Sequence, residues 1–289
     1  MDTQTDCVSC FLRQAGEVAR FATDDDAVRA TMTAEARRIT ASADLAMPPV
    51  ALGQRVHRML RATSGDPDPY RPAKSRYNRL VTELVPELRA MIDQALDPLA
   101  VAVRLAIAAN VIDFAAHGDL TATEVLVALR AAAGQPLHAD LAAFRAALAT
   151  AERVLYLTDN AGEIAVDRLL IERIGPRRVT VAVRGGAVIN DATRADADEV
   201  GLPGLVEVID NGSDAPGTLL ADCSQAFLAR FAAADLIIAK GQGNYESLIE
   251  VPRPIFLLFK VKCAVVAEHA GLPLGSHALL PATAGQRLR

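Results

Sequence analysis

The spacing of apolar residues changes near residue 152 and divides the chain into two halves. Before that point apolar residues recur every three or four positions, which is typical of helices. Pro48-Pro49 separates two of these segments, and Pro98 suits a first helical turn. The pattern predicts helices at residues 11–21, 33–46, 49–62, 73–96, 98–116, 121–133 and 138–150. Residues 1–150 are therefore predicted to form an all-helical region.

Residues 151–289 show short apolar runs instead, most of them followed by Gly, Asp or Asn. Five of these runs predict strands, at Val154–Leu157, Val179–Val183, Leu205–Ile209, Leu236–Ile238 and Ile255–Phe259. Helical patterns lie between several of them, and this alternation is typical of a mainly parallel sheet with helices on its faces. The fold class is therefore α/β, with residues 276–289 predicted to be a loosely structured tail.

Composition narrows the class of protein. The chain has 289 residues, of which 51% are hydrophobic and 22% charged, as in a globular protein. A net charge of −5 without any basic stripe argues against a nucleic-acid partner. No apolar run is long enough to cross a membrane, and the polar first residues do not resemble a signal peptide. The four cysteines are too few for a disulfide scaffold, so a cytoplasmic protein is expected.

Chemistry is expected just after each strand, because parallel sheets bind ligands beyond the carboxyl ends of their strands. Asp159 and Asn160 follow the first strand, and their oxygens suit Mg²⁺ or Mn²⁺. The helix that begins near Gly162 would direct free backbone N–H groups toward an anion at the same place. The alternative is that Asp159 and Asn160 only cap that helix.

The other strand ends carry similar residues. The later clusters are Arg184–Thr193, Asp210–Thr218, Lys240–Glu246, and the trio Lys260, Lys262 and Cys263. Each cluster alone is compatible with ordinary turn chemistry. Together they supply carboxylates, amides, glycines and lysines at one edge of a sheet, which suits a metal ion and a phosphorylated ligand.

The helical half contributes two polar residues inside an apolar helical segment. Asn110 and Asp113 are three positions apart, so they share one helix face. They form either a hydrogen-bonded or solvent-facing polar stripe, or a face that covers the mouth of the site.

On these residues the sequence resembles the metal-dependent damage-control phosphatases, also known as domain of unknown function 89. The matching segments are Asp159–Glu163, Asn190–Thr193, Lys240–Glu246, Ala109–Asp113, and Pro69-Tyr70 with Lys74 and Asn78. Cys7-Val8-Ser9-Cys10 is similar to the N-terminal Cys-x-x-Cys of the archaeal and bacterial subfamily. These segments span nearly the whole chain in one order.

The resemblance implies a helical N-terminal region packed on a Rossmann-like, doubly wound sheet domain. It also implies a divalent metal (Mn²⁺, Mg²⁺, Co²⁺ or Ni²⁺) held by Asp159, Asn160 and Asp191. Lys262 lies where relatives place a substrate-contacting lysine. Relatives active on sugar phosphates carry Arg-Thr-x-Lys there, whereas this chain has Phe259-Lys260-Val261-Lys262. The missing arginine puts fructose-phosphate-like substrates in doubt.

The resulting hypothesis is hydrolysis of phosphomonoesters of small, possibly damaged, metabolites such as sugar phosphates or phosphopantetheine-like compounds. Asp159, Asp191, Lys240 and Lys262 are the expected catalytic residues. Either Asp159 or a metal-activated water could attack phosphorus, and water is favoured. The expected substrate-binding residues are Asn110, Asp113, Glu163, Gly241, Gln242, Gly243, Asn244, Tyr245 and Glu246.

Two points stay open at this stage. The main alternative function is a non-catalytic module that binds a phosphometabolite or a metal. Cys7 and Cys10 could be half of a zinc site, a redox pair or two buried apolar residues, and Cys223 and Cys263 could complete a four-thiolate site.

Overall fold

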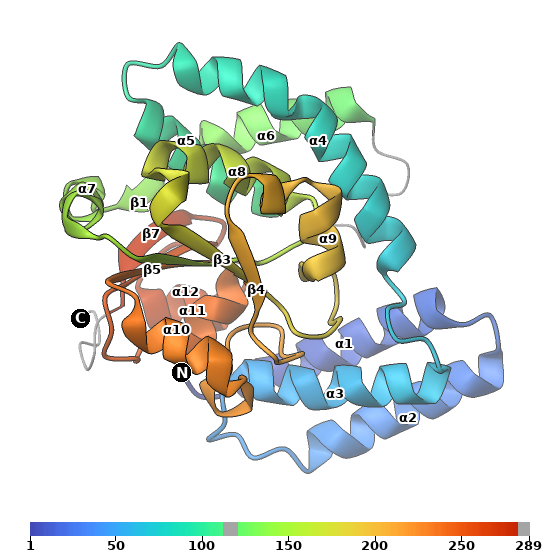
Figure 1. Ribbon diagram of the computed structural model, residues 1–289. Coiled ribbons are helices and arrows are strands. Elements are labelled where there is room, and N and C mark those ends of the chain that lie inside the picture. Colours follow the sequence, from blue (N-terminus) through green and yellow to red (C-terminus); the bar gives the residue numbers. More distant parts are fainter. Residues whose placement is uncertain (112–120, 283–289) are drawn as a thin grey trace.

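The computed structural model describes residues 1–111 and 121–282, in which a seven-stranded sheet carries helices on both faces and a bundle of three helices at one end (Figure 1). The helices are α1 (Thr5–Ala22), α2 (Asp26–Ala41), α3 (Pro49–Ser64), α4 (Arg71–Asp93), α5 (Pro98–Ala108), α6 (Ala122–Ala133), α7 (Leu141–Thr150), α8 (Glu163–Ile174), α9 (Arg194–Glu199), α10 (Gln225–Ala233), α11 (Gln242–Leu248) and α12 (Ala264–Ala270). The strands are β1 (Leu137–Ala139), β2 (Val154–Leu157), β3 (Val179–Val183), β4 (Glu207–Asp210), β5 (Leu236–Lys240), β6 (Ile255–Lys260) and β7 (His277–Pro281).

The sheet has the order β1-β7-β6-β5-β2-β3-β4. Strands β6, β5, β2, β3 and β4 are parallel, and β7 is antiparallel to β6. Every residue of β2 and β5 is buried, as expected for central strands of a parallel sheet covered on both faces. The predicted α/β class with a mainly parallel sheet is confirmed.

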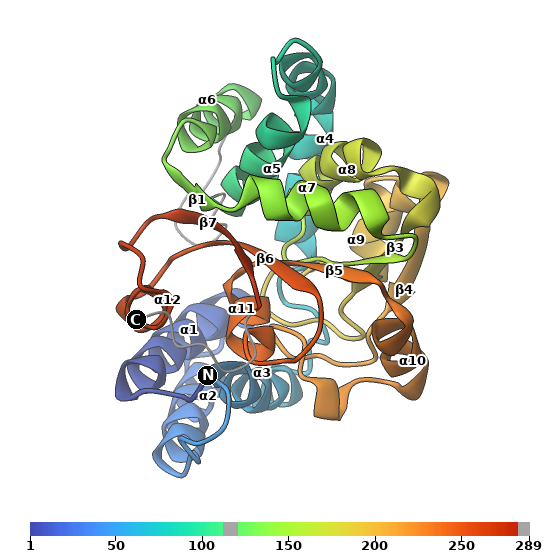
Figure 2. The same cartoon turned by 90° about the vertical axis from the view of Figure 1, so that its left-hand side faces the viewer.

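Alternate residues of each strand face two different hydrophobic layers. Val154 and Tyr156 pack with α4, α5, α6 and α8 on one face, whereas Leu155 and Leu157 pack with α10, α11 and α12 on the other. Figure 2 shows these two sets of helices on opposite sides of the sheet. The helical first half of the chain therefore packs directly on the sheet. The domain boundary at residue 150 stays a prediction.

Two strands were not predicted. β1 lies in a segment predicted to begin a helix, and β7 lies in the segment predicted to be a loose tail. β1 has only three residues, and β7 reads His-Ala-Leu-Leu-Pro, a run too short to show a period of two. Their strand conformation comes from pairing: β1 pairs with β7, and β7 pairs with both β1 and β6.

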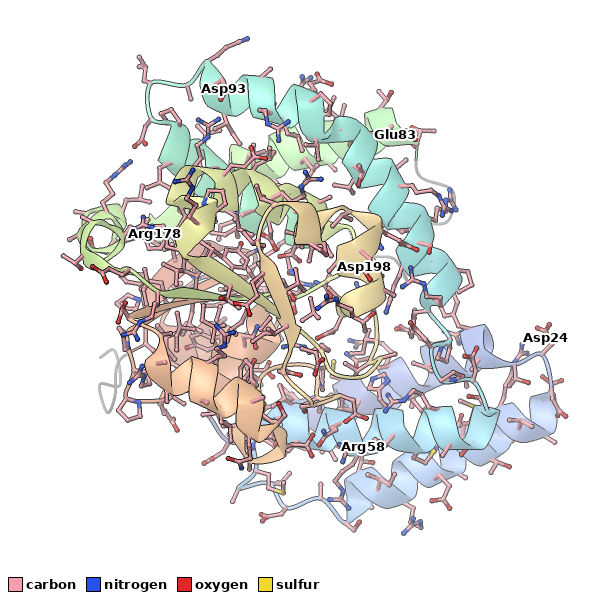
Figure 3. All side chains as sticks on the ribbon, in the orientation of Figure 1. Asp24, Arg58, Glu83, Asp93, Arg178 and Asp198 are labelled. Atoms are coloured by element: carbon pink, nitrogen blue, oxygen red, sulfur yellow. The ribbon has the colours of Figure 1, made fainter. Side chains whose placement is uncertain are left out.

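The bundle of α1, α2 and α3 lies beside the loops that follow the parallel strands. Arg58 on α3 (Figure 3) donates from Nε to Asp214 Oδ1 at 2.8 Å, in the loop after β4. Gln54, one turn earlier, donates from Nε2 to Asp214 Oδ1 at 2.8 Å and to Asp222 Oδ2 at 2.6 Å. These contacts place the N-terminal helices next to the carboxyl edge of the sheet, where ligands are expected.

Among the described residues, no helix combines the length and apolar character needed to cross a bilayer.

Candidate active site

The loops after β2 and β3 are joined by backbone hydrogen bonds. Ala192 N donates to Asp159 O at 2.7 Å, and Ala161 N donates to Asn190 O at 2.9 Å. Asn160 and Asp191 form an isolated antiparallel bridge. The three residues predicted to bind a metal, Asp159, Asn160 and Asp191, are thus brought together at the carboxyl edge of the sheet.

Two side-chain amides link Asp159 to Glu163. Asn110 donates from Nδ2 to Asp159 Oδ2 at 2.7 Å and to Glu163 Oε2 at 2.8 Å. Asn160 donates from Nδ2 to the same two oxygens at 2.8 and 3.1 Å. Asn110 lies in the 3₁₀ turn after α5, so the helical half does reach the site at this residue. Asp113, predicted to share its face, lies outside the described residues.

Asp191 occupies a tight turn in which its N–H donates to Val188 O at 3.0 Å. Ile189 in this turn has φ 44°, a left-handed conformation that is costly for a β-branched side chain. The surrounding structure maintains this strained conformation, and the turn fixes the position of the Asp191 carboxylate.

The site carries excess negative charge. Burial, together with the charges of Glu163 and Asp191, raises the pKa of Asp159 to about 7 against the opposing effect of Lys262 and Arg184. Burial also raises the pKa of Asp191, although the Arg184 guanidinium opposes the shift. Buried carboxylates that face one another are stabilised by a cation placed between them.

Arg184, at the end of β3, was part of a strand-end cluster but was not predicted as a site residue. Its Nε donates to Asp191 Oδ2 at 2.7 Å, and a terminal nitrogen lies 3.9 Å from Asp159 Oδ1. That nitrogen, Nη2, is buried and has no hydrogen-bond partner. A buried arginine with an unused donor beside two carboxylates can bind an additional anion. The signal in the sequence was a basic residue at a strand end followed by two glycines.

Lys240, at the end of β5, is fully buried and surrounded by acceptors. Its ammonium group donates to Glu163 Oε1 at 2.5 Å, Asp167 Oδ1 at 2.6 Å and Ala106 O at 2.8 Å. An ammonium group has three N–H donors, and all three are used here. Lys240 is therefore placed to hold Glu163 rather than to touch a phosphate.

The glycine loop after β5 lies directly under Asp159. Gly241 has φ +84°, and a Cβ at this position would overlap the Asp159 carboxyl group. Gly243 packs against the backbone of Pro216 with similarly little room. Only glycine fits at both positions, so the start of α11 can approach the carboxylate closely.

The remaining residues of this loop have mixed surroundings. Asn244 is buried and donates to Lys240 O at 2.7 Å, and the Tyr245 hydroxyl bonds His269 Nδ1 at 2.7 Å. Gln242 donates to Glu246 Oε1 at 2.9 Å and accepts from Lys262 N at 2.9 Å. Asn244 and Tyr245 thus support the loop from inside, while Gln242 connects it to Lys262.

Lys262 is exposed at the carboxyl end of β6, and its charge lowers the pKa of Asp159. Unlike Lys240, it has no hydrogen bond or ion pair from its ammonium group to any described residue, so it is available for a ligand.

The backbone N–H groups at the start of α8, which were expected to be free for an anion, are partly occupied by hydrogen bonds within the protein. Gly162 N donates to Asn78 Oδ1 at 2.6 Å, and Ile164 N donates to Asn160 O at 3.3 Å. Asn78 reaches this helix from α4, a long-range contact that local sequence does not reveal.

No three His, Cys, Asp or Glu side chains of the described residues form a ready-made metal centre. The four cysteines are free thiols and do not form the four-thiolate site that was considered. The predicted set of Asp159, Asn160 and Asp191 has two carboxylates, so an amide must supply the third oxygen. Asn110 Oδ1 is also buried without a hydrogen-bond partner. This set of hard oxygen donors, with excess negative charge, fits a divalent cation.

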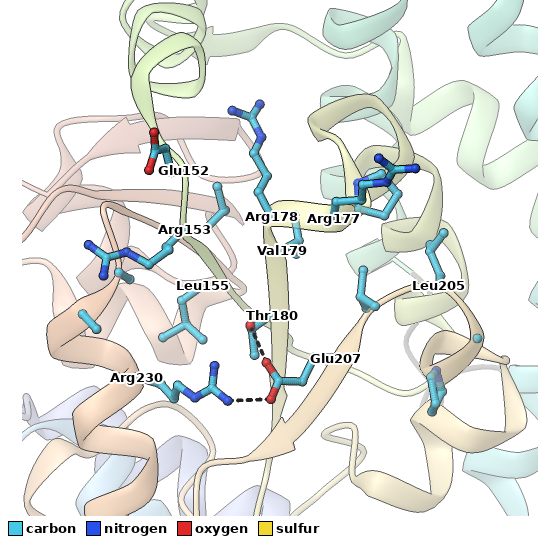
Figure 4. Close-up of a pocket in the computed structure, with 17 residues that line it drawn as sticks. Glu152, Arg153, Leu155, Arg177, Arg178, Val179, Thr180, Leu205, Glu207 and Arg230 are labelled. Atoms are coloured by element: carbon cyan, nitrogen blue, oxygen red, sulfur yellow. Dashed lines mark hydrogen bonds and ion pairs between the residues drawn. The ribbon is translucent and has the colours of Figure 1, made fainter.

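A cavity of about 600 Å³ lies at the opposite, amino-terminal edge of the strands (Figure 4). Three of its four arginines are engaged: Arg230 bonds Glu207 at 2.6 Å (Figure 4), and Arg153 bonds Asp235 at 2.9 Å. Arg178 donates to backbone carbonyl oxygens. None of the residues predicted for the site lines this cavity.

Comparison with known proteins agrees with this geometry. The family pattern of the damage-control phosphatase ARMT1-like domain matches residues 3–278. The chain belongs to this family. It is 32% identical to a damage-control phosphatase of Pyrococcus horikoshii, over 96% of both chains, and 32% identical to one of Archaeoglobus fulgidus, over 93% of this chain and 95% of that one. An uncharacterized protein of Methanocaldococcus jannaschii is 35% identical over 95% of this chain and 94% of its own length.

The fold agrees as well. The crystal structure of a protein of the DUF89 family from Pyrococcus horikoshii superposes with a TM-score of 0.87 at 31% identity, covering 98% of this chain and all of that chain.

Proposed function

We propose that this protein is a divalent-metal-dependent phosphatase that hydrolyses phosphomonoesters of small metabolites. The observation that carries the proposal is the pair of buried carboxylates, Asp159 and Asp191, joined at adjacent strand ends beside a glycine loop and an available lysine. The names of the relatives support a phosphatase role.

In this proposal Asp159, Asn160 and Asp191 hold the metal, which supplies Lewis-acid chemistry at the phosphoryl oxygens. The Asn160 amide presents its nitrogen to Asp159 in the structure, and a half-turn about Cβ–Cγ would present its oxygen instead. The Asn110 amide can turn in the same way, which makes both amides adaptable to a cation.

The protein's own groups carry the rest of the mechanism. The exposed Lys262 and the unused Arg184 nitrogen offset charge on the phosphoryl oxygens, together with the backbone N–H groups of Gln242 and Gly243. In the structure Glu163, held by Lys240, accepts hydrogen bonds from the same two amides as Asp159. We favour water over Asp159 as the attacking group, because the proposal already assigns Asp159 to the metal.

The finer assignments are proposals of the same kind. Cys7 and Cys10 suggest the archaeal and bacterial subfamily, and the free thiols suit a cytoplasmic location.

The direct test is release of p-nitrophenol from p-nitrophenyl phosphate by chelator-treated protein. Mg²⁺, Mn²⁺, Co²⁺ and Ni²⁺ are added back singly, to the wild type and to Asp191→Asn. We expect turnover to return with metal in the wild type only. Asp198→Asn is the matched control, because Asp198 lies on α9 at the surface and is 58% exposed (Figure 3). Metal binding without turnover on this ester and on a panel of phosphorylated metabolites would instead support a binding module.

Metal affinity should depend on pH. The pKa of Asp159 is raised to about 7, so below neutral pH protons compete with the metal for this carboxylate. We expect the apparent affinity for Mn²⁺ to fall by about tenfold for each pH unit below 7, since one proton is displaced per ion bound. Calorimetric titrations between pH 5.5 and 8 measure this slope. Affinity that stays constant over this range would contradict the assignment of Asp159 as a ligand.

A further inference from the structure

Two lysines, Lys260 and Lys262, lie at the carboxyl end of β6. Lys260 is the last residue of the strand, and Lys262 follows two positions later. The chain stays paired here, because Val261 N donates to Ser276 O at 2.9 Å. Residues two apart on an extended chain share one side, about 7 Å from each other. Lys260 shares the side of Leu258, which belongs to the hydrophobic layer that includes α5.

The surroundings of Lys260 are basic. It is half-buried and pairs across the β6–β7 ladder with His277. Burial lowers the pKa of Lys260, and the neighbouring charge of Lys262 lowers it further. Burial, together with the charges of Lys260 and Arg104, lowers the pKa of His277 to about 4.

No described carboxylate forms an ion pair with Lys260, whereas Lys240 at the end of the neighbouring strand has two. A half-buried ammonium group beside a like charge is costly unless an anion compensates it. The carboxyl end of β6 therefore has the positive charge expected of a site for an anionic group.

We propose that Lys260 is a specificity residue that binds a second anionic group, a carboxylate or another phosphate, on the substrate. The inference rests on the proposed function, in which Lys262 and the Asp159–Asp191 centre take the phosphoryl group. Lys262, Arg184 and the metal would then contact the phosphoryl group. Because Lys260 lies about 7 Å from Lys262 along the chain, it is left for a second group further along the substrate. The substrate class is a small phosphomonoester that carries an additional acid.

Binding is tested with two phosphonates that cannot be hydrolysed. Propylphosphonate has one anionic group, and 3-phosphonopropionate has the same length with a terminal carboxylate. With Mn²⁺ present, we expect the wild type to bind 3-phosphonopropionate at least tenfold more tightly. Lys260→Met should remove this difference and leave propylphosphonate affinity within twofold, whereas Lys260→Arg should keep it. Thermal unfolding checks that both variants are folded.

Turnover provides the second arm, with glycerol 3-phosphate and 3-phosphoglycerate as substrates. Lys260→Met should raise KM for 3-phosphoglycerate about tenfold, with kcat and the glycerol 3-phosphate kinetics little changed. Equal losses for the compounds with one and with two anionic groups would overturn the proposal and place Lys260 at the phosphoryl group. If no phosphate ester is hydrolysed but the phosphonate difference depends on Lys260, the proposed function fails and the anion site stands.

Discussion

Replacing Asp159 with asparagine should strongly lower phosphatase turnover and at the same time stabilise the metal-free protein. The carboxylate lies in a buried site beside Glu163 and Asp191, and its pKa is raised from 3.8 to about 7. A carboxyl group whose pKa is higher in the folded state lowers the stability as pH rises through this range. The asparagine side chain has the same shape and can still accept the two amide hydrogen bonds, but it carries no charge.

The expected loss in kcat/KM is on the order of 10³-fold, as for removal of a group that stabilises a transition-state charge. The expected gain in the free energy of unfolding of the metal-free protein is about 1 kcal/mol at neutral pH. Substitutions in a functional site often raise stability in this way, because the native residues serve activity at a cost in stability. Denaturant unfolding of chelator-treated protein measures the second quantity.

The pH dependence separates this effect from a change in packing. The stability difference between Asp159→Asn and the wild type should be largest at pH 7 and shrink toward pH 4, because the wild-type carboxyl group then becomes protonated. Added Mn²⁺ should raise the melting temperature of the wild type and not that of the variant. Asp198→Asn should change neither activity nor the response to Mn²⁺. A variant that loses stability at every pH would show that Asp159 serves the fold instead.

The proximity of Asp159 and Asp191 could be predicted, because parallel topology leaves few choices. Strand ends of a parallel sheet converge at one edge, so Asp159 and Asp191 meet although 31 positions separate them in sequence. Gly241 was predicted to bind substrate as part of the loop after β5. It lies so close to the Asp159 carboxyl group that a Cβ would not fit, which explains why glycine stands at this position.

Other features depend on partners that local pattern does not reveal. Lys240 was predicted to meet a phosphate because it is a lysine at a strand end, but its neighbours Glu163 and Asp167 occupy its donors. Asn78 caps the start of α8 from a different helix. Strand β7 forms because β6 offers an edge, since its own residues have no clear period. In each case a tertiary contact decides what the residue does.

Replacing Lys240 with methionine should therefore damage the fold before it damages substrate binding. The variant leaves Glu163 and Asp167 facing each other in a fully buried position without their shared cation. Removing one partner of a buried ion pair typically costs about 3–5 kcal/mol, because the remaining charge is uncompensated. We expect a loss of this size in the free energy of unfolding at pH 7, measured with denaturant.

The loss should shrink as the pH falls. Burial already raises the pKa of Asp167 to about 6, with Lys240 as the main opposing charge. Without the lysine, this pKa should rise further, so acid neutralises the group in the folded protein and removes part of the penalty. Combining Lys240→Met with Glu163→Gln and Asp167→Asn should recover much of the stability, because no unpaired buried charge is left.

Lys262→Met is the matched comparison, because it removes the same charge from an exposed side chain whose ammonium group has no hydrogen bond to a described residue. It should lower kcat/KM and leave the free energy of unfolding within about 0.5 kcal/mol of the wild type. If Lys240→Met instead kept wild-type stability and raised KM for phosphate esters, its ammonium group would contact the substrate. The two lysines at neighbouring strand ends would then share one role, whereas the hydrogen bonds of Lys240 assign it to the interior of the protein.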